Sequence, residues 1–130
     1  MYKRQYEYSY IKKSGSTIGQ ECFIIDDIDL FTKIIKDILS GKKYDFISAK
    51  FHNTLANIIL DISLKTRKRF SINNVALSGG VFQNNYLIDK TFEMLENNAF
   101  NVYTNWKVPV NDGGVSLGQA YLGLKSINVF

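Results

Sequence analysis

The sequence predicts an α/β fold in which parallel strands are flanked by helices, and two observations carry this prediction. The first is the run VALSGGVFQN at residues 75–84, which reads as a buried strand, a glycine pair and the start of a helix. The second is that another strand, at residues 101–104, follows that helix, so that strand, helix and strand occupy about thirty residues, the length of a βαβ unit. The two strands should therefore be parallel, with a right-handed crossover between them.

The N-terminal region predicts a hairpin. Tyr6, Tyr8 and Tyr10 alternate with other residues, which is the period of two expected of a strand with one aromatic face. The β-rich run at residues 21–25 can pair back on it through a turn at Ser14-Gly15-Ser16, and the first five residues should fray.

Two helices are predicted next. Asp26, Asp27 and Asp29 offer N-terminal caps for an amphipathic helix that Gly41 ends. Its apolar positions are Leu30, Phe31, Ile34, Ile35, Ile38 and Leu39. The second helix is expected to start near Ser48 and to run out through the basic residues 65–69. Its apolar face is formed by Phe51, Leu55, Ile58, Ile59 and Ile62.

The C-terminal half predicts two further helices around the second strand. A helix over residues 85–97 should turn Ile88, Phe92 and Leu95 inward, and Asn97 or Asn98 is expected to take the left-handed conformation at its end. A terminal helix begins at about Val115, in which Gly118 and Ala120 should allow tight packing.

Composition limits the function classes. The chain has 130 residues, 45% of them hydrophobic, and a net charge of +4, which indicates one folded domain or one lobe of a larger one. The basic run at 65–69 complements a helix dipole and has no interleaved aromatics, so nucleic-acid binding is not indicated. Without an apolar stretch that could span a membrane or a signal peptide, we expect a soluble, cytoplasmic protein that does not bind membranes.

Neither the single cysteine nor the single histidine is predicted to be catalytic. Cys22 lies in a predicted strand, where it should act as a small hydrophobic residue, and no internal disulfide can form. His52 flanks the apolar face of the second helix and is interpreted as a hydrogen-bonded packing residue.

The candidate site lies at two glycine turns. Gly79-Gly80 and Gly113-Gly114 each follow a predicted parallel strand, so both should lie at the carboxyl edge of the sheet, where α/β proteins bind ligands. Asn84 can contact a base or ribose, and Asp112 can hold a divalent cation through its carboxylate. Both side chains can instead serve only as helix caps, and the turns need not bind a ligand.

Two motifs resemble the C-terminal part of the hydrogenase-maturation carbamoyltransferases, the HypF family. They are ALSGGVFQN at residues 76–84 and VPVNDGGVSLGQ at residues 108–119, and the resemblance begins at FHNTLA, residues 51–56. It implies one lobe of an actin-like/Hsp70/sugar-kinase (ribonuclease H-like) fold over residues 1–130. Strands and a helix occupy 1–47, and the α/β part that bears the motifs occupies 48–130.

The resemblance also implies an activity and a set of site residues. The family activates carbamoyl phosphate with ATP to carbamoyl adenylate and passes the carbamoyl group to a C-terminal cysteine of the partner protein HypE. By motif position, Asp112 corresponds to a metal-ligating aspartate, and the metal's identity stays open. Asn84 corresponds to a nucleotide-contacting asparagine. Gly79 and Gly80 fall in the turn that approaches phosphate, and Gly113 joins the nucleotide-binding set.

The departures from the family pattern matter equally. By the resemblance, the paired metal-binding histidines of the family lie upstream of the matched region, and this chain contains only His52. The resemblance also leads us to expect no adenylate-forming domain in this chain, and Ala99 stands where the family usually has glycine. We therefore expect a fragment that is inactive alone and that self-associates through an apolar face left by a missing lobe. Alternatives are a tRNA threonylcarbamoyl-transfer protein of the same fold and a non-catalytic module that binds a nucleotide or a partner.

Overall fold

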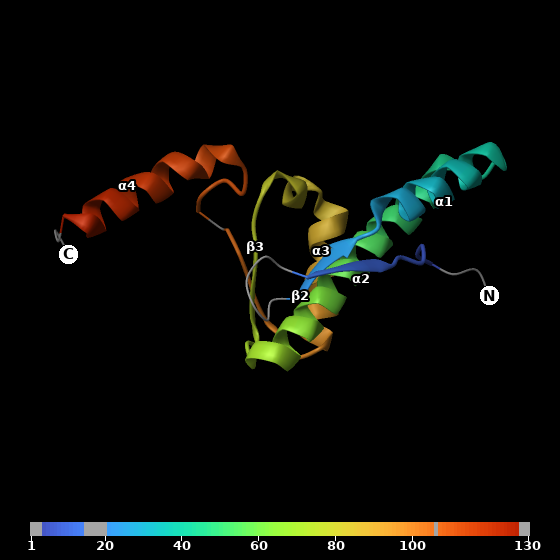
Figure 1. Ribbon diagram of the computed structural model, residues 1–130. Coiled ribbons are helices and arrows are strands. Elements are labelled where there is room, and N and C mark those ends of the chain that lie inside the picture. Colours follow the sequence, from blue (N-terminus) through green and yellow to red (C-terminus); the bar gives the residue numbers. More distant parts are fainter. Residues whose placement is uncertain (1–3, 15–20, 106, 128–130) are drawn as a thin grey trace. The chain divides into compact units, whose positions relative to one another are not determined.

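The computed structural model describes residues 4–14, 21–105 and 107–127 of the chain, which divides into two compact units, Met1–Ile58 and Ile59–Phe130. Figure 1 shows the elements of both units in chain order. Among the described residues, no helix is both long and apolar enough to cross a membrane. The division expected from the sequence, into residues 1–47 and a motif-bearing part at 48–130, stays a prediction.

The hairpin of the first unit confirms the expected pairing. Strands β1 (Tyr10–Ser14) and β2 (Glu21–Ile25) are antiparallel, with Tyr10 opposite Ile25 and Ser14 opposite Glu21. Part of the predicted turn at Ser14-Gly15-Ser16 lies outside the described residues.

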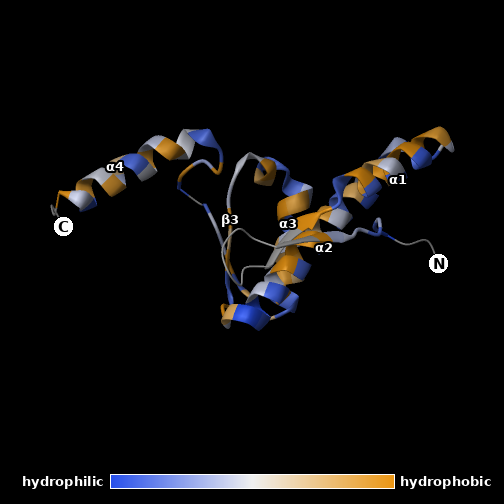
Figure 2. Ribbon diagram, in the orientation of Figure 1, coloured by the Kyte–Doolittle hydropathy of each residue, from blue (hydrophilic) through white to orange (hydrophobic). Residues whose placement is uncertain are grey.

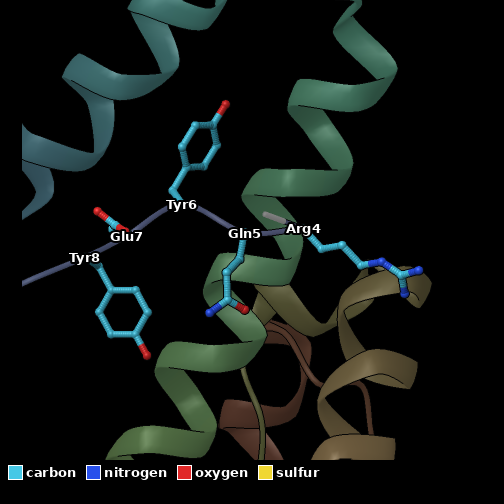
Figure 3. A pocket seen from close by; sticks show the side chains of 5 residues that line it. All are labelled: Arg4, Gln5, Tyr6, Glu7 and Tyr8. Carbon is cyan, nitrogen blue, oxygen red and sulfur yellow. The ribbon is translucent and has the colours of Figure 1, made fainter. Parts of the chain in front are cut away.

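The predicted strand at Tyr6 is wrong, because β1 starts only at Tyr10. The backbone N–H of Tyr6 donates to Thr54 Oγ1 at 2.8 Å, so a side chain of helix α2 (Tyr44–Phe70) takes a donor that a strand ladder would use. Figure 3 shows the rings of Tyr6 and Tyr8 pointing to opposite sides of the segment, whereas a strand places residues two apart on one face. The Tyr8 ring packs edge-on against Tyr10, with centroids 5.7 Å apart.

Helix α1 (Asp27–Leu39) forms as its caps predict. The side chain of Asp26 accepts a hydrogen bond from Asp29 N at 3.2 Å, and Gly41 ends the turn at φ +75°. Its burial was predicted only in part. Leu30 is buried, but so is the charged Asp37, whereas four of the other predicted apolar positions are exposed: Phe31, Ile35, Ile38 and Leu39.

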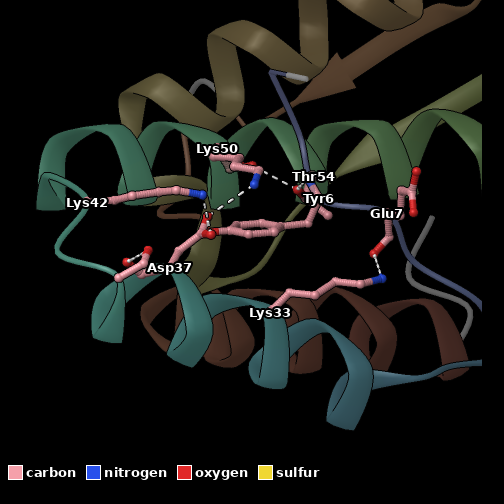
Figure 4. Close-up of polar contacts among 8 residues, drawn as sticks. Tyr6, Glu7, Lys33, Asp37, Lys42, Lys50 and Thr54 are labelled. Carbon is pink, nitrogen blue, oxygen red and sulfur yellow. Dashed lines mark hydrogen bonds and ion pairs between the residues drawn. The ribbon is translucent and has the colours of Figure 1, made fainter. Parts of the chain in front are cut away.

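A polar cluster around Asp37 binds the elements of the first unit to one another (Figure 4). Asp37 accepts hydrogen bonds from Lys42 at 2.5 Å, Lys50 at 3.1 Å and the hydroxyl of Tyr6 at 3.0 Å. The hydrogen bond from Lys42 is the largest influence that lowers the pKa of Asp37 to about 2. Burial, helped by Asp37, raises the pKa of Tyr6 to about 12.

Helix α2 begins four residues before the expected Ser48. Its buried residues are Ile47, Thr54, Ala56 and Ile58. Ile62, predicted on the inner face, is 43% exposed. His52 bonds through Nδ1 to Ser48 O at 2.8 Å, one turn earlier, which agrees with its interpretation as a hydrogen-bonded packing residue.

The second unit confirms the α/β prediction. Strands β3 (Asn74–Leu77) and β4 (Asn101–Thr104) are parallel, with Asn74 opposite Asn101 and Leu77 opposite Thr104. Helix α3 (Asn85–Asn97) connects them. The core consists of Leu77, Leu95 and Phe100, and seven partly buried residues pack against it: Ile59, Leu60, Leu64, Val75, Phe82, Ile88 and Val102.

Two details of the helices differ from the predictions. The left-handed residue after α3 is Ala99, at φ +58°, whereas Asn98 has φ −103°, so the turn comes later than expected. Helix α4 (Val115–Ser126) starts as predicted but has no buried residue, and a Cβ added at Gly118 meets nothing within 4 Å. The tight packing predicted there is therefore not formed by the described part of the chain.

Candidate functional site

The two glycine turns lie side by side. The N–H of Gly79, which follows β3, donates to the carbonyl oxygen of Val110, which precedes the second glycine pair, at 2.7 Å. Because β3 and β4 are parallel neighbours, both turns leave the same edge of the sheet. The structure thus brings together two motifs that lie about thirty residues apart in sequence.

A cavity of about 320 Å³ lies between the turns. It is lined by Ser78, Gly79, Asn105, Pro109, Val110, Asn111, Asp112, Gly114 and Val115. The lining therefore combines backbone from both turns with one carboxylate and several side chains that carry hydroxyl or amide groups, which is a chemistry suited to a polar ligand.

The first turn depends on the conformation of Gly79. Its φ of +104° is one that side-chain-bearing residues rarely adopt, and its carbonyl accepts from Phe82 N at 3.0 Å as the short helix η1 (Gly80–Gln83) begins. Asn84 follows η1 and caps α3, because its Oδ1 accepts from Leu87 N at 3.0 Å.

The second turn depends on Gly114 and Asn111. A Cβ added at Gly114 would lie 2.7 Å from Pro109 O, so this position requires glycine for close backbone approach. Asn111 Oδ1 accepts from Gly113 N at 3.0 Å and caps the short helix η2 (Asp112–Gly114). The cap anticipated at Asn84 is therefore present, whereas the one anticipated at Asp112 is wrong: Asn111 caps the second turn, and Asp112 is the first residue of η2.

The two helices that leave the site begin differently. Asn84 caps α3 with its side chain, whereas no side chain caps the start of α4 at Gly114. The first-turn N–H groups of an α-helix have no partner within the helix, and they carry the positive end of its dipole. At α4, however, η2 runs directly into the helix, and the N–H groups of Gly114 and Val115 donate to Asn111 O and Asp112 O, so these donors already have protein acceptors.

Asp112 is the carboxylate of the cavity lining, and it is exposed. Its neighbours in the lining supply further oxygen atoms, from Ser78, Asn105 and Asn111. Among the described residues, no group of three or more histidine, cysteine, aspartate or glutamate side chains could hold a metal ion. One carboxylate fits a hard cation such as Mg²⁺, which is commonly held by one or two carboxylates together with ligand phosphates.

The predicted site residues are only partly brought together. Gly79 and Asp112 line the cavity, whereas Gly80, Asn84 and Gly113 do not, although Gly80 and Gly113 adjoin lining residues in the sequence. The sequence interpretation did not assign Ser78, Asn105 or Asn111 to the site. Their signal was available, because each is a polar residue at or just after the carboxyl end of a strand, or in the following turn.

Fold and site together define an α/β subdomain with paired glycine turns around one shared cavity. A sequence model of the family described as "Carbamoyltransferase, Kae1-like Domain, second subdomain" matches residues 2–119. The chain belongs to this family, that of the HypF carbamoyltransferases.

Solved structures and curated relatives agree with this assignment. A crystal structure of full-length HypF in its phosphate- and nucleotide-bound form has a TM-score of 0.85 and 42% identity, over 95% of this chain and 16% of that chain. The T. kodakarensis HypF structure has a TM-score of 0.68 and 30% identity, over 80% and 13%. Carbamoyltransferase HypF of Synechocystis sp. is 39% identical over 77 residues, which cover 59% of this chain and 10% of that protein. The chain thus spans about a tenth of the length of the curated relatives it matches.

Proposed function

We propose that this chain is the C-terminal lobe of an actin-like carbamoyl-transfer domain and that its cavity receives the phosphate-bearing part of a nucleotide. Two features support the proposal: the parallel strands β3 and β4, and the glycine turns that the hydrogen bond between Gly79 and Val110 joins. The related full-length HypF structure was obtained in a phosphate- and nucleotide-bound form.

The proposed reaction belongs to the whole protein. It uses carbamoyl phosphate and ATP, forms carbamoyl adenylate, and carbamoylates the C-terminal cysteine of a HypE-type partner during [NiFe]-hydrogenase maturation in the cytoplasm. The family model and the HypF relatives support carbamoyl transfer. The substrates and the partner come from the resemblance of the two glycine motifs.

Each site residue has a proposed role. Gly79 and Gly114 let the backbone approach the phosphate groups, because a side chain at either position would be strained or would clash. Gly80 and Gly113 belong to the same turns. Asn84 would contact the nucleotide from the side chain that also caps α3.

Asp112 would hold a divalent cation jointly with the phosphates of the ligand. When bound, such a cation would stabilise negative charge that develops on phosphate or carbamoyl oxygens. The chain's own contribution is to position the ligand at the shared edge of β3 and β4.

The observation that carries the proposal is the cavity shared by the two turns, and calorimetric titration with AMP and ATP tests it. We expect the chain to bind in the presence of Mg²⁺ and Asp112→Ala to weaken binding at least about tenfold, through loss of a charged metal ligand. Asp89→Ala is the matched control, because Asp89 is an exposed aspartate of α3 that does not line the cavity. In EDTA the Asp112→Ala variant and the wild type should bind equally.

Asn84 needs a variant that keeps the helix cap. Asn84→Ser retains a capping oxygen and removes the amide nitrogen, so α3 should persist while the nucleotide contact is lost. If Asn84→Ser and Asp112→Ala both bind as tightly as wild type, the site assignment is wrong.

A binding module without turnover is the second candidate for the chain by itself. This candidate is favoured by the side chains available as metal ligands. Within the described part of the chain, no three histidine, cysteine, aspartate or glutamate side chains gather where they could hold a metal ion. Carbamoyl-adenylate formation measured with the purified chain alone would contradict it, whereas nucleotide binding without turnover would support it.

A further inference from the structure

Helix α1 exposes its apolar side. Ile28, Phe31, Ile35, Ile38 and Leu39 are 76%, 54%, 54%, 42% and 81% exposed, respectively, and we call these five residues the α1 stripe. Apolar residues recur along α1 in Figure 2. An amphipathic helix normally turns such a stripe towards a core, so this arrangement is the reverse of the usual one.

The spacing of the α1 stripe suits another helix. Its first four members follow one another at intervals of three, four and three residues, which are the a and d positions of two heptads. Residues at this spacing insert between the side chains of a facing helix. No described part of the chain buries them.

The polar cluster fixes the direction in which the stripe points. Asp37, on the opposite side of α1, is buried and accepts hydrogen bonds from Lys42, Lys50 and Tyr6 (Figure 4). Rotating α1 to bury the stripe would break these bonds and leave Lys50, whose side chain is only 15% exposed, without its carboxylate. The stripe is therefore held outward by the fold of the first unit.

The stripe is complementary to itself in the antiparallel direction. Intervals of three, four and three read the same from either end, so an antiparallel copy places Ile28 opposite Ile38 and Phe31 opposite Ile35. The charges are also complementary, because Asp26, Asp27 and Asp29 lie at the start of α1. Lys36 and Lys43 lie at or just beyond its end. An antiparallel pair brings each acidic end near the partner's basic end, and the helix dipoles oppose each other favourably.

We propose that the α1 stripe is the interface of a homodimer in which two copies of α1 pack antiparallel about a twofold axis. The five residues leave roughly 600 Å² of surface exposed per copy, at the upper end of the largest apolar patch that a monomer usually exposes. If two copies covered all of it, roughly 1,200 Å² would be buried, the lower end of specific interfaces, so we expect a weak dimer that forms at high protein concentration.

Size-exclusion chromatography with light scattering tests the dimer with the 130-residue chain. The mass should rise from 14.9 kDa to twice that value as the concentration increases to hundreds of micromolar. Phe31→Glu and Ile35→Glu should each weaken association at least about a hundredfold, because each change occurs twice in a twofold interface. Leu117→Glu, at a 56% exposed leucine of α4, is the matched control and should leave the dimer intact.

Cysteine cross-linking tests the orientation of the two helices. In a Cys22→Ser background, an equal mixture of the Ile28→Cys and Ile38→Cys chains should form the mixed disulfide in preference to either symmetric one. Three results would overturn the proposal. The chain could be monomeric at all concentrations, Leu117→Glu could weaken association as much as Phe31→Glu does, or the symmetric 28–28 and 38–38 cross-links could dominate. Circular dichroism of each variant establishes that the helices remain folded.

Discussion

Helices α1 and α3 are alike in sequence design and opposite in burial. Each has 13 residues, and each is capped by an Asx side chain that accepts from the N–H three residues later, Asp26 in α1 and Asn84 in α3. Yet α3 buries Leu87, Thr91 and Leu95, whereas α1 buries Leu30 and Asp37 and exposes most of its large apolar residues.

The difference shows that an amphipathic pattern fixes a helix but not its orientation. In the second unit a strand pair and α2 residues offer α3 an apolar surface, and Leu95 enters the core. In the first unit, Lys42, Lys50 and Tyr6 offer α1 a charged surface, and Asp37 enters it. The more favourable contact decided the orientation of each helix.

The largest expected effect comes from truncating the buried side of α3. Leu95 is fully buried, so Leu95→Ala should lower the free energy of unfolding by about 3 kcal/mol through lost burial and a cavity. Phe31→Ala, the matched truncation on the exposed side of α1, should cost less than about 1 kcal/mol, measured by urea denaturation at low concentration, where the chain is monomeric. Equal losses would mean that the α1 stripe is buried.

The next largest effect comes from the buried side of α1. Asp37→Asn should lower the free energy of unfolding by about 2 kcal/mol, because Lys50 and Lys42 lose their carboxylate partner. Asp61→Asn removes a more exposed carboxylate, which pairs with Lys65 four residues away, and should cost less than about 0.5 kcal/mol in the same urea experiment.

Acid should reproduce the effect of Asp37→Asn. The unfolded chain protonates Asp37 near its ordinary pKa of 3.8, but the folded chain holds that pKa at about 2. Stability from this group is therefore present above pH 4 and falls by about 2 kcal/mol as the pH drops from 4 to 2. The Asp37→Asn variant should lose that part of the acid dependence in urea titrations at each pH.

Removing the side-chain cap of either helix should lower the free energy of unfolding by a similar and smaller amount. This tests the cap, which is the feature that α1 and α3 share. Asp26→Ala and Asn84→Ala should each cost about 1 kcal/mol, since each leaves one N–H at the start of its helix without a partner. If Asn84→Ala lowers the protection of backbone amides from hydrogen exchange only in α3, the result would agree with this reason. A much larger loss for either would indicate a role in tertiary packing.

The smallest expected effect is stabilising and concerns the end of α3. Ala99 has φ +58°, a conformation that glycine adopts without a steric penalty. Ala99→Gly should therefore raise the free energy of unfolding by up to about 1 kcal/mol, because relief of strain exceeds the added flexibility of the unfolded chain. Gly41→Ala, at φ +75° after α1, should change stability in the opposite direction.

Much of the candidate site was predictable because its geometry is local. The glycine pair after β3, the cap at Asn84 and the start of α4 at Val115 all follow from residue types at fixed offsets. Ser78, Asn105 and Asn111 escaped prediction because they become neighbours only when Gly79 N meets Val110 O across the sheet edge. The left-handed residue after α3 was predicted at Asn97 or Asn98 for a different reason, because asparagine adopts this conformation more readily than alanine. In the structure Ala99 adopts it despite its side chain.

The sequence by itself determined the elements that depend on neighbouring residues: the bounds of α1 and α3, their caps, and the parallel pair of short strands. Local hydrogen bonds and side-chain periodicity are sufficient to specify these. Only the tertiary structure decided that Asp37 would be buried while Phe31 would not, and that two turns would share one cavity. These outcomes depend on which distant groups meet, because a buried charge is stable only where partners such as Lys42 and Lys50 are already placed.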